Sequence, residues 1–518
     1  MRINKIVLLL FALFIFSGCK GSSETGGDND AEPGNNDNKT DNLCGNGVVD
    51  PGEECDGGFE DCADLDSSYV SGLAVCTEEC KWDFSGCLTE EDEKPDYETG
   101  PIEFEKILMD DDPMNPAFVT VVDLNQNGFK DVIVCQYGPP TNISMKGRID
   151  IYWGTGNLND WDRETLDTSG DVRFPHPVLV EDLNDNGKMD MIVPVGFLAC
   201  ESNPLGGGPC GALFWLEQTD NGWTRHDIVP DGSDLFFFDV VLVDLDGDGI
   251  KDIVTNGSYM KKNLMGTISE KKEVLMWFKG VDSPQRFDPE PRIISDHAGG
   301  PFPRVLDLTG NGKLDIVTAQ YFTMDTSQYG SFLWFEQISI DHWETHIINA
   351  DSGEGFMIEM IHDFYGDGVL RGVGVNHVNT NDFPDGPEEG VFIFDIPENP
   401  RELWPKTTIS HGIKSRKSPM TGPQAAPGLL GYGDISGNGL TDLVVSGDGD
   451  SRVFWYQQAK PGEFIQHVLD GIKDEPLMRS EFGQAGGMKI VDLDNDGYNE
   501  IIVTSYEDNK IWIYKVIR

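Results

Sequence analysis

The sequence DLDGDGIKDIV at residues 244–254 decides how this chain folds. Its first nine residues place a carboxylate at positions 1, 3, 5 and 9: Asp244, Asp246, Asp248 and Asp252. Gly249 at position 6 allows the sharp turn that brings these oxygens together, and the backbone carbonyl of Ile250 at position 7 is a further donor. A hard cation such as Ca²⁺ takes about six to eight oxygen ligands at roughly 2.3–2.6 Å. The spacing therefore predicts a calcium-binding loop.

The segments on either side of this loop indicate β-strands. VVLV precedes the loop and KDIV closes it, and both runs are rich in β-branched residues. An EF-hand begins with a similar loop, but it needs Glu at position 12 and a helix on each side, whereas position 12 here is Thr255. We therefore expect a calcium loop at the turn of a β-hairpin.

The loop recurs along the chain. Six related stretches are DLNQNGFKD from Asp123, DLNDNGKMD from Asp182, DLTGNGKLD from Asp307, DFYGDGVLR from Asp363, DISGNGLTD from Asp434 and DLDNDGYNE from Asp492. With the loop at Asp244, each begins between 56 and 71 residues after the one before. Such a period is the sequence sign of a repeat architecture.

Each repeat carries further strand-forming segments after its loop. An apolar run comes first, followed by an aromatic strand: RIDIYWG, ALFWLEQ, VLMWFKG, SFLWFEQ, VFIFDIP, RVFWYQQ and KIWIYKV in chain order. Several repeats add an amphipathic strand, as in WTRHDIV, WETHIIN and FIQHVLD. Four strands in each of seven repeats predict an all-β fold, a seven-bladed β-propeller of four-stranded blades at residues 101–518.

The two ends of the repeat region predict how the ring closes. The last repeat stops after its third strand, at Arg518. The segment IEFEKILMD at residues 102–110 resembles a fourth strand and has no repeat of its own. We expect it to complete the last blade; the alternative is an unrelated strand that precedes the first blade.

Six of the seven loops carry a full set of oxygen donors for structural Ca²⁺. We expect up to six ions, with the third and seventh loops as the strongest sites because they hold four carboxylates each. The fifth loop has Arg371 at position 9, so we expect a guanidinium paired with Asp363 and Asp367 in place of an ion. The alternative for every loop is an Asp/Asn/Gly-rich turn without an ion. The predicted metal ligands are Asp123, Asn125, Asn127, Asp131, Asp182, Asn184, Asn186, Asp190, Asp244, Asp246, Asp248, Asp252, Asp307, Thr309, Asn311, Asp315, Asp434, Ser436, Asn438, Asp442, Asp492, Asp494, Asp496 and Glu500.

With these loops in place, the repeats resemble the FG-GAP/VCBS-type repeats of integrin α-subunit propellers and of many bacterial surface proteins. The resemblance covers roughly residues 101–518. The Phe-Gly and Gly-Ala-Pro elements of the family are mostly missing, and EFGQAGG at residues 481–487 comes nearest to them. The resemblance implies the propeller fold and its calcium sites, but it does not identify a ligand.

The amino terminus carries export signals. Residues 1–18 combine a positively charged start, an apolar run and Ser-Gly before Cys19, which is the order of a secretory signal peptide. Cys19 resembles the modified cysteine of bacterial lipoproteins, which implies lipidation and anchoring to the outer membrane or cell surface of a Gram-negative bacterium. An ordinary cleaved signal is the alternative. Residues 19–43 are Gly-, Ser-, Asn- and Asp-rich and predict a flexible, disordered tether.

A small cysteine-rich module follows at residues 44–87, and an acidic linker at residues 88–100 joins it to the propeller. Its start, CGNGVVDPGEECDGG, resembles the short Cys-rich repeats of myxobacterial surface proteins. An exported segment of this size needs disulfides, and zinc is a poorer alternative because the module has neither His nor paired CxxC. Cys135 lies in an apolar run and is expected to be a buried free thiol. The predicted disulfide cysteines are Cys44, Cys55, Cys62, Cys76, Cys80 and Cys87 in the module, and Cys200 with Cys210 in the propeller.

If the calcium loops join the first two strands of each blade, the connections from strand two to three and from strand four to one emerge on the opposite face. The long connections there are residues 136–147, 196–211, 256–273, 321–330, 376–390, 410–429 and 471–487. Variable loops on a rigid scaffold concentrate binding residues. The alternative for each side chain is that it only packs within its own loop. The candidate ligand-binding residues on this face are Tyr137, Arg173, His176, Tyr259, His297, Arg304, Tyr321, His377, His411, Arg416 and Arg479.

Charge and composition restrict the function. A formal net charge of −52 excludes nucleic acid, which needs a basic surface. We expect a monomeric, lipid-anchored cell-surface propeller that binds a carbohydrate or a protein and has no catalytic residues. Two alternatives remain: a calcium-dependent polysaccharide lyase or related carbohydrate-active enzyme, and a structural envelope component. A cluster of His176, Arg304 and a tyrosine at the axis would favour the enzyme, and an aromatic-lined groove would favour binding.

Overall fold

The computed structural model describes most of the chain, which forms two compact units, residues 1–98 and 99–518. The placed residues are 49, 51–56, 59–77, 80–84, 87–89, 102–138, 146–197, 208–262, 268–321, 330–380, 384–418, 422–471 and 485–517. The signal segment, the tether, Cys19 and Cys44 therefore lie outside the described residues. In the part of the chain that is described, no helix is long and apolar enough to cross a membrane.

The first unit is a small disulfide-bonded sheet. Its elements are β1 (Phe59–Asp61), α1 (Cys62–Leu65), β2 (Tyr69–Cys76), β3 (Trp82–Asp83) and β4 (Cys87–Thr89), and β2 pairs with all three other strands. Cys55 and Cys76 form a disulfide with a Cα–Cα distance of 5.8 Å. Cys62 and Cys80 are disulfide-bonded as well. The prediction that disulfides hold this module is confirmed for these four cysteines.

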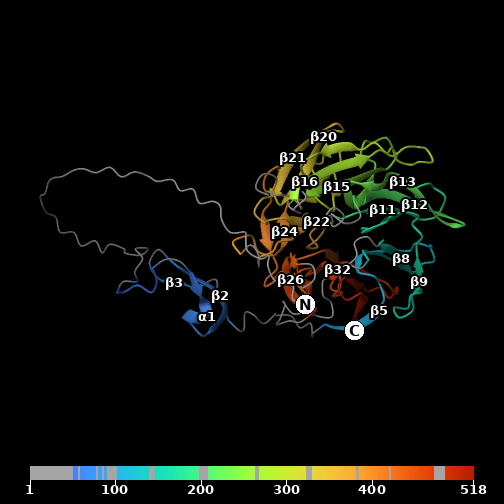
Figure 1. Ribbon diagram of the computed structural model, residues 1–518. Coiled ribbons are helices and arrows are strands. Elements are labelled where there is room, and N and C mark those ends of the chain that lie inside the picture. Colours follow the sequence, from blue (N-terminus) through green and yellow to red (C-terminus); the bar gives the residue numbers. More distant parts are fainter. Residues whose placement is uncertain are drawn as a thin grey trace, which may run out of the picture. The chain divides into compact units, whose positions relative to one another are not determined.

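The second unit is an all-β propeller of seven four-stranded antiparallel sheets, as predicted (Figure 1). The first four blades are β6 (Pro116–Val122), β7 (Asp131–Gln136), β8 (Arg148–Trp153) and β9 (Asp162–Thr165); β10 (Leu179–Glu181), β11 (Asp190–Val195), β12 (Gly211–Thr219) and β13 (Gly222–Ser233); β14 (Phe236–Val243), β15 (Asp252–Lys262), β16 (Ile268–Phe278) and β17 (Arg292–Ser295); β18 (Arg304–Leu306), β19 (Asp315–Ala319), β20 (Phe332–Ser339) and β21 (His342–Asn349).

The last three blades complete the ring. They are β22 (Gly355–His362), β23 (Leu370–Asn376), β24 (Val391–Asp395) and β25 (Lys406–Thr408); β28 (Leu430–Gly433), β29 (Asp442–Ser446), β30 (Val453–Lys460) and β31 (Glu463–Asp470); and β32 (Ala485–Val491), β33 (Glu500–Ser505), β34 (Lys510–Ile517) and β5 (Glu103–Asp110). The first strands of neighbouring blades contact one another, as β32 contacts β6 and β28, so they lie innermost around the axis.

The predicted closure of the ring is confirmed. Strand β5 is the fourth strand of the seventh blade and pairs with β34, with Ile107 opposite Ile513 and Phe104 opposite Val516. In Figure 1 the blue β5 lies beside the red strands of the last blade. The two ends of the propeller therefore share one sheet, and separation of the ring at this point would expose the edge of β34.

The blades bury both faces of their middle strands. All six residues of β7, β11 and β33 are buried, which explains why the apolar runs after the loops do not alternate with polar residues. Farther out, a Trp of the third strand packs against a His of the fourth in three blades: Trp215 with His226, Trp334 with His346 and Trp455 with His467. Cys135 is buried and free, as predicted, and Cys210 is disulfide-bonded, whereas Cys200 lies outside the described residues.

Two segments that the sequence suggested as irregular connections contain strands. Residues 256–273 extend β15 and β16 into a long hairpin, in which Tyr259 pairs with Lys272. The segment has no proline and contains β-forming Tyr and Ile, so nothing ends the ladder where the blade ends. In residues 410–429, β26 (Arg416–Ser418) and β27 (Gly422–Gln424) form a separate hairpin.

We expect adjacent residues of β5 to differ sharply in their effect on stability. Ile107 is 6% exposed and Leu108 is 44% exposed. Ile107→Ala should lower the free energy of unfolding by about 2–5 kcal/mol because it leaves a cavity in the core shared by the seventh and first blades. Leu108→Ala should change it by at most about 0.5 kcal/mol. Urea unfolding of both variants measures the difference, and equal effects would show that β5 does not complete the blade in solution.

Candidate functional site

The seven predicted loops occupy equivalent places. Each joins the first strand of a blade to the second, as residues 244–251 join β14 to β15, so all seven emerge on one face of the propeller. Gly249 at position 6 has a φ of +90°, a conformation that residues with a side chain rarely adopt. The glycine that the motif predicts is thus required by the backbone.

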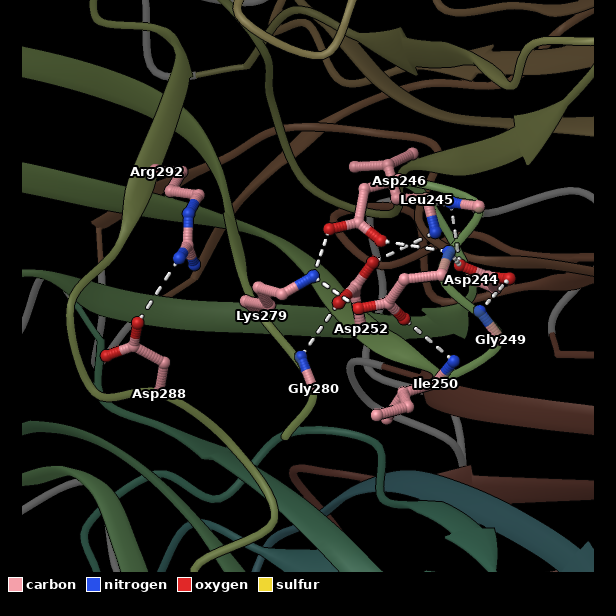
Figure 2. Close-up of polar contacts among 12 residues, drawn as sticks. Asp244, Leu245, Asp246, Gly249, Ile250, Asp252, Lys279, Gly280, Asp288 and Arg292 are labelled. Atoms are coloured by element: carbon pink, nitrogen blue, oxygen red, sulfur yellow. Dashed lines mark hydrogen bonds and ion pairs between the residues drawn. The ribbon is translucent and has the colours of Figure 1, made fainter. Parts of the chain in front are cut away.

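The third loop shows how the carboxylates are held (Figure 2). Asp244 Oδ1 accepts the N–H groups of Gly247 at 2.8 Å and Asp248 at 3.0 Å, and its Oδ2 accepts that of Gly249 at 2.9 Å. Asp248 Oδ1 accepts the N–H of Ile250 at 2.9 Å. The backbone of the loop therefore orients both oxygens of Asp244 and one oxygen each of Asp246 and Asp248, and the second oxygens of Asp246 and Asp248 accept no backbone N–H among the described bonds.

The carboxylate at position 9 has a second role that the sequence analysis missed. Asp252 is fully buried, and it accepts the N–H of Leu245 at 2.9 Å and that of Gly280 at 2.7 Å. It thereby joins the start of its loop to the end of the third strand, β16. Four other blades repeat this bridge, through Asp131, Asp190, Asp315 and Asp442. Burial raises the pKa of Asp190 and of Asp442 to about 6, although backbone N–H groups oppose the shift.

A lysine faces the centre of the third loop. Lys279 Nζ contacts Asp246 Oδ2 and lies 2.6 Å from Asp248 Oδ2 (Figure 2). Its hydrogen bonds to Asp246 and Asp248 raise the pKa of Lys279 to about 12. The seventh loop has the same arrangement: Lys515 Nζ lies 2.5 Å from Asp494 Oδ2 and 2.6 Å from Asp496 Oδ2.

The fifth loop holds the predicted guanidinium, but its partners differ in part. Arg371 makes two hydrogen bonds to Asp367, at 2.8 and 2.7 Å, and a third to Asp395 at 3.0 Å. Asp363, the other predicted partner, instead accepts the N–H of Gly368 at 2.6 Å. Hydrogen bonds from Arg371 lower the pKa of Asp367 to about 2.

The remaining loops offer oxygen donors that suit calcium. In the fourth loop, Thr309 Oγ1 at position 3 is buried and has no hydrogen-bond partner among the described residues. Asn311 Oδ1 at position 5 accepts only the N–H of Lys313 among the bonds described, at 2.8 Å, so a lone pair remains. These donor sets fit a hard cation.

A cluster of aromatic side chains surrounds the axis on the opposite face. Tyr137 lies 3.2 Å from His176 Nε2, which donates to the carbonyl of Gly196 at 2.9 Å. Phe118 and Phe238 pack on the His176 ring at centroid distances of 5.0 and 4.4 Å. His176 is fully buried, and this burial lowers its pKa to about 3.

A second group of the cluster is partly exposed. Tyr321 and Phe356 pack against His377 at centroid distances of 5.5 and 4.8 Å. His377 Nδ1 donates to the carbonyl of Pro427 at 2.7 Å, and its Nε2 lies 3.8 Å from Asp448 Oδ2. The structure therefore brings together four predicted residues as two pairs, Tyr137 with His176 and Tyr321 with His377.

Arg304 does not join these pairs. It makes two hydrogen bonds to Glu359 and lies 3.2 Å from Asp239 Oδ2. Burial would lower the pKa of Arg304, but the Glu359 and Asp239 carboxylates outweigh burial and raise it. Among the described contacts, the Arg304 guanidinium is therefore paired with carboxylates rather than with His176.

The other candidate ligand residues lie apart. Arg173 is buried and bonds to the carbonyl of Pro209 at 3.3 Å, and His297 is exposed beside Asp296. Tyr259 lies on the extended hairpin, and Arg416 begins β26, where only its backbone is described. Arg479 lies outside the described residues.

His411 lines a groove of about 630 Å³ on the fifth blade. The groove lies between the connection from β23 to β24 and the connection that follows β25, so it opens on the face opposite the calcium loops. Its lining combines charged groups of both signs with hydrogen-bonding groups and the largely buried ring of Phe392; the charged and polar members are Asp351, Thr380, Glu388, Glu389, Lys406, His411 and Lys414. A groove of this size suits a small ligand, for which about 300–1,000 Å³ is usual.

Comparison with known proteins agrees with the fold. Residues 123–193, which contain the first two loops, match the FG-GAP-like repeat family. No curated protein matches the chain. Among solved structures, the chain is similar to BBS1N in complex with ARL6DN, soaked with mercury (TM-score 0.44, 9% identity, 80% of this chain and 97% of that one). It is also similar to puromycin hydrolase (TM-score 0.41, 13% identity, 77% and 53%).

Similarities at these TM-scores carry no argument about function. The family match and the seven-bladed ring together show a β-propeller with FG-GAP-type repeats, which confirms the resemblance that the loops predicted. Such a fold is consistent with a binding or adhesion role.

Acid should destabilise the propeller partly through His176. Its pKa is about 3 in the folded chain and 6.5 as the reference value, so the unfolded state binds more protons below pH 6.5 and stability falls with pH. This residue alone should lower the free energy of unfolding by about 2 kcal/mol between pH 7 and pH 5.

Unfolding in urea at both pH values tests this expectation. His176→Gln should remove that part of the pH dependence, whereas the control His342→Gln, at a side chain that is 64% exposed, should keep it. An unchanged slope in His176→Gln would show that the ring is protonated in the folded protein.

Proposed function

We propose that this protein is a calcium-stabilised, lipid-anchored propeller that binds an extracellular carbohydrate or protein through the face opposite its calcium loops. The groove on the fifth blade is the observation that carries this proposal. It places Lys406, His411 and Lys414 with a phenyl ring, Phe392, in one hollow. The hollow also holds Asp351, Glu388 and Glu389, and Lys406 pairs with Asp351. Charged groups of both signs and hydrogen-bonding groups in one hollow suit a polar ligand such as a carbohydrate.

The groove is built on a rigid support. Glu389 is 8% exposed and accepts hydrogen bonds from Thr380 Oγ1 at 2.8 Å and from the N–H of Ser415 at 3.1 Å. Lys406 lies 2.6 Å from Asp351 and 5.0 Å from the centroid of Phe392. These contacts fix the walls before a ligand arrives, which reduces the entropy lost on binding.

Calcium has a structural role in this proposal. A bound ion supplies positive charge where carboxylate, amide and hydroxyl oxygens converge at the turns of up to six hairpins, the fifth excepted. Extracellular calcium modules bind at about 10⁻⁴–10⁻³ M, so the ions would be present whenever the protein is outside the cell. Export and lipidation at Cys19 complete the proposal, with the tether and the cysteine-rich module as spacers between the membrane and the propeller.

Calcium should raise the melting temperature of the propeller. Calorimetry of the lipid-free chain in EGTA and in about 5 mM Ca²⁺ measures the shift, since about 5 mM exceeds the expected dissociation constants. Mg²⁺ at the same concentration is the control, because it is smaller and dehydrates reluctantly. Equal melting temperatures in EGTA and Ca²⁺ would remove the calcium part of the proposal.

A glycan array in calcium tests the groove. We expect binding to a glycan, and His411→Ala with Lys414→Ala should weaken it at least about 10-fold, since the lost charged contact of Lys414 alone contributes about 1.5–3 kcal/mol. The control is Lys460→Ala, an exposed lysine at the end of β30 that leaves the groove unchanged. Equal loss in both variants would place binding elsewhere, and an empty array would favour a protein partner.

A further inference from the structure

The seven blades allow one residue to be compared seven times within a single chain. In each blade one residue of the third strand lies opposite position 9 of the loop. In the fifth blade the ladder itself pairs the two residues, Arg371 and Asp395. In the other six blades the ladder begins one residue after position 9, and extending its register by one residue identifies the facing residue. In blade order these residues are Trp153, Glu217, Lys279, Glu336, Asp395, Gln457 and Lys515.

The charge of this facing residue follows the charge of the loop. The third and seventh loops have carboxylates at positions 1, 3, 5 and 9, and they are the two loops that face a lysine. The first, second, fourth and sixth loops have amide or hydroxyl groups at positions 3 and 5, and they face Trp, Glu or Gln. The fifth loop carries its own cation, Arg371, and faces an acid.

The lysines contact the oxygens that an ion would need. Lys279 Nζ bonds to Oδ2 of both Asp246 and Asp248, the ligands at positions 3 and 5 (Figure 2). Lys515 Nζ reaches positions 3, 5 and 9, with Glu500 Oε1 at 3.1 Å. An ammonium group and a calcium ion cannot share these oxygens, because each would lie where the other makes its contacts.

We propose that Lys279, Arg371 and Lys515 take the place of calcium in the third, fifth and seventh loops, so that the propeller binds four ions, in its first, second, fourth and sixth loops. The inference rests on the proposed calcium function and narrows the calcium sites from six loops to four. It also reverses the order expected from carboxylate number alone, by which the third and seventh loops would bind most tightly.

The physical reason is competition within the molecule. A group that is tethered next to its partners acts at an effective concentration of millimolar or more. The dissociation constants expected for extracellular calcium modules are about 10⁻⁴–10⁻³ M. Formation of these ion pairs also costs little conformational entropy, since the two carboxylate partners of Lys279 are already oriented by backbone N–H groups.

Calcium stoichiometry of the purified chain tests the inference. Equilibrium dialysis in about 0.15 M KCl with excess Mg²⁺ suppresses weak binding to the acidic surface. We expect four ions for the unaltered chain. Lys279→Met and Lys515→Met keep the length of the side chain and remove its charge, so each should add one ion, and the double variant should bind six.

Melting temperature gives a second readout. In EGTA, Lys279→Met should melt several degrees lower because its carboxylates repel one another, and Ca²⁺ should restore the melting temperature. Asp494 Oδ1, buried without a hydrogen-bond partner among the described residues, offers an added oxygen to the ion in Lys515→Met. The matched control is Lys251→Met, which removes a lysine of the same loop that pairs with Glu181 instead. It should change neither the stoichiometry nor the response to calcium.

The outcomes separate the two proposals. Six ions on the unaltered chain would overturn this inference and leave the proposed calcium function intact, with the lysines serving only to balance charge. Four ions on both the unaltered chain and the double variant, with no rescue by calcium, would also overturn it. Binding of no ion by any of the chains would refute the proposed calcium function itself.

Discussion

The bridge made by the buried carboxylate at position 9 is the interaction on which the propeller depends. Asp252 accepts one N–H from its own loop and another from the end of β16, so one side chain fixes the hairpin turn and the neighbouring strand together. Its complete burial is possible because backbone donors replace water. The same bridge in the blades of Asp131 and Asp315 shows that it belongs to the repeat.

The fifth blade shows what happens when this carboxylate is missing. Here a basic residue, Arg371, stands at position 9 of the loop, and an acidic residue, Asp395, lies opposite it on the third strand. Arg371 also makes two hydrogen bonds to Asp367, and this pair closes the loop. The charges are reversed, but the turn and the strand remain joined. The loop and the third strand of this blade are thus joined by side-chain ion pairs, where the neighbouring blades use hydrogen bonds from backbone N–H groups to a carboxylate.

The sequence predicted most of the fold because its signals are local. A loop of nine residues with glycine at position 6 recurs seven times, and each copy fixes the turn between two strands, which then fixes blade number and order. Even the closing strand at residues 102–110 was visible as a fourth strand without a repeat. The extended hairpin of β15 and β16 could not be predicted in this way, because pairing between strands decides where a strand ends. The sequence around Tyr259 does not indicate that this residue pairs with Lys272.

The site was harder to predict for a related reason. The motif names the residues within a loop, but Lys279 lies 27 residues beyond Asp252 and reaches the loop only through the pairing of β15 with β16. The same holds at the axis, where Arg304 meets Glu359 from a different blade and is thereby unavailable to His176. If Lys279 and Lys515 replace calcium as proposed, counting carboxylates within a motif overestimates how strongly the third and seventh loops attract metal, because the third strand supplies a cation opposite each of them. In a repeat protein, the third-strand residue that faces the loop belongs to the site as much as the loop motif does. Only the register of the two strands identifies that residue.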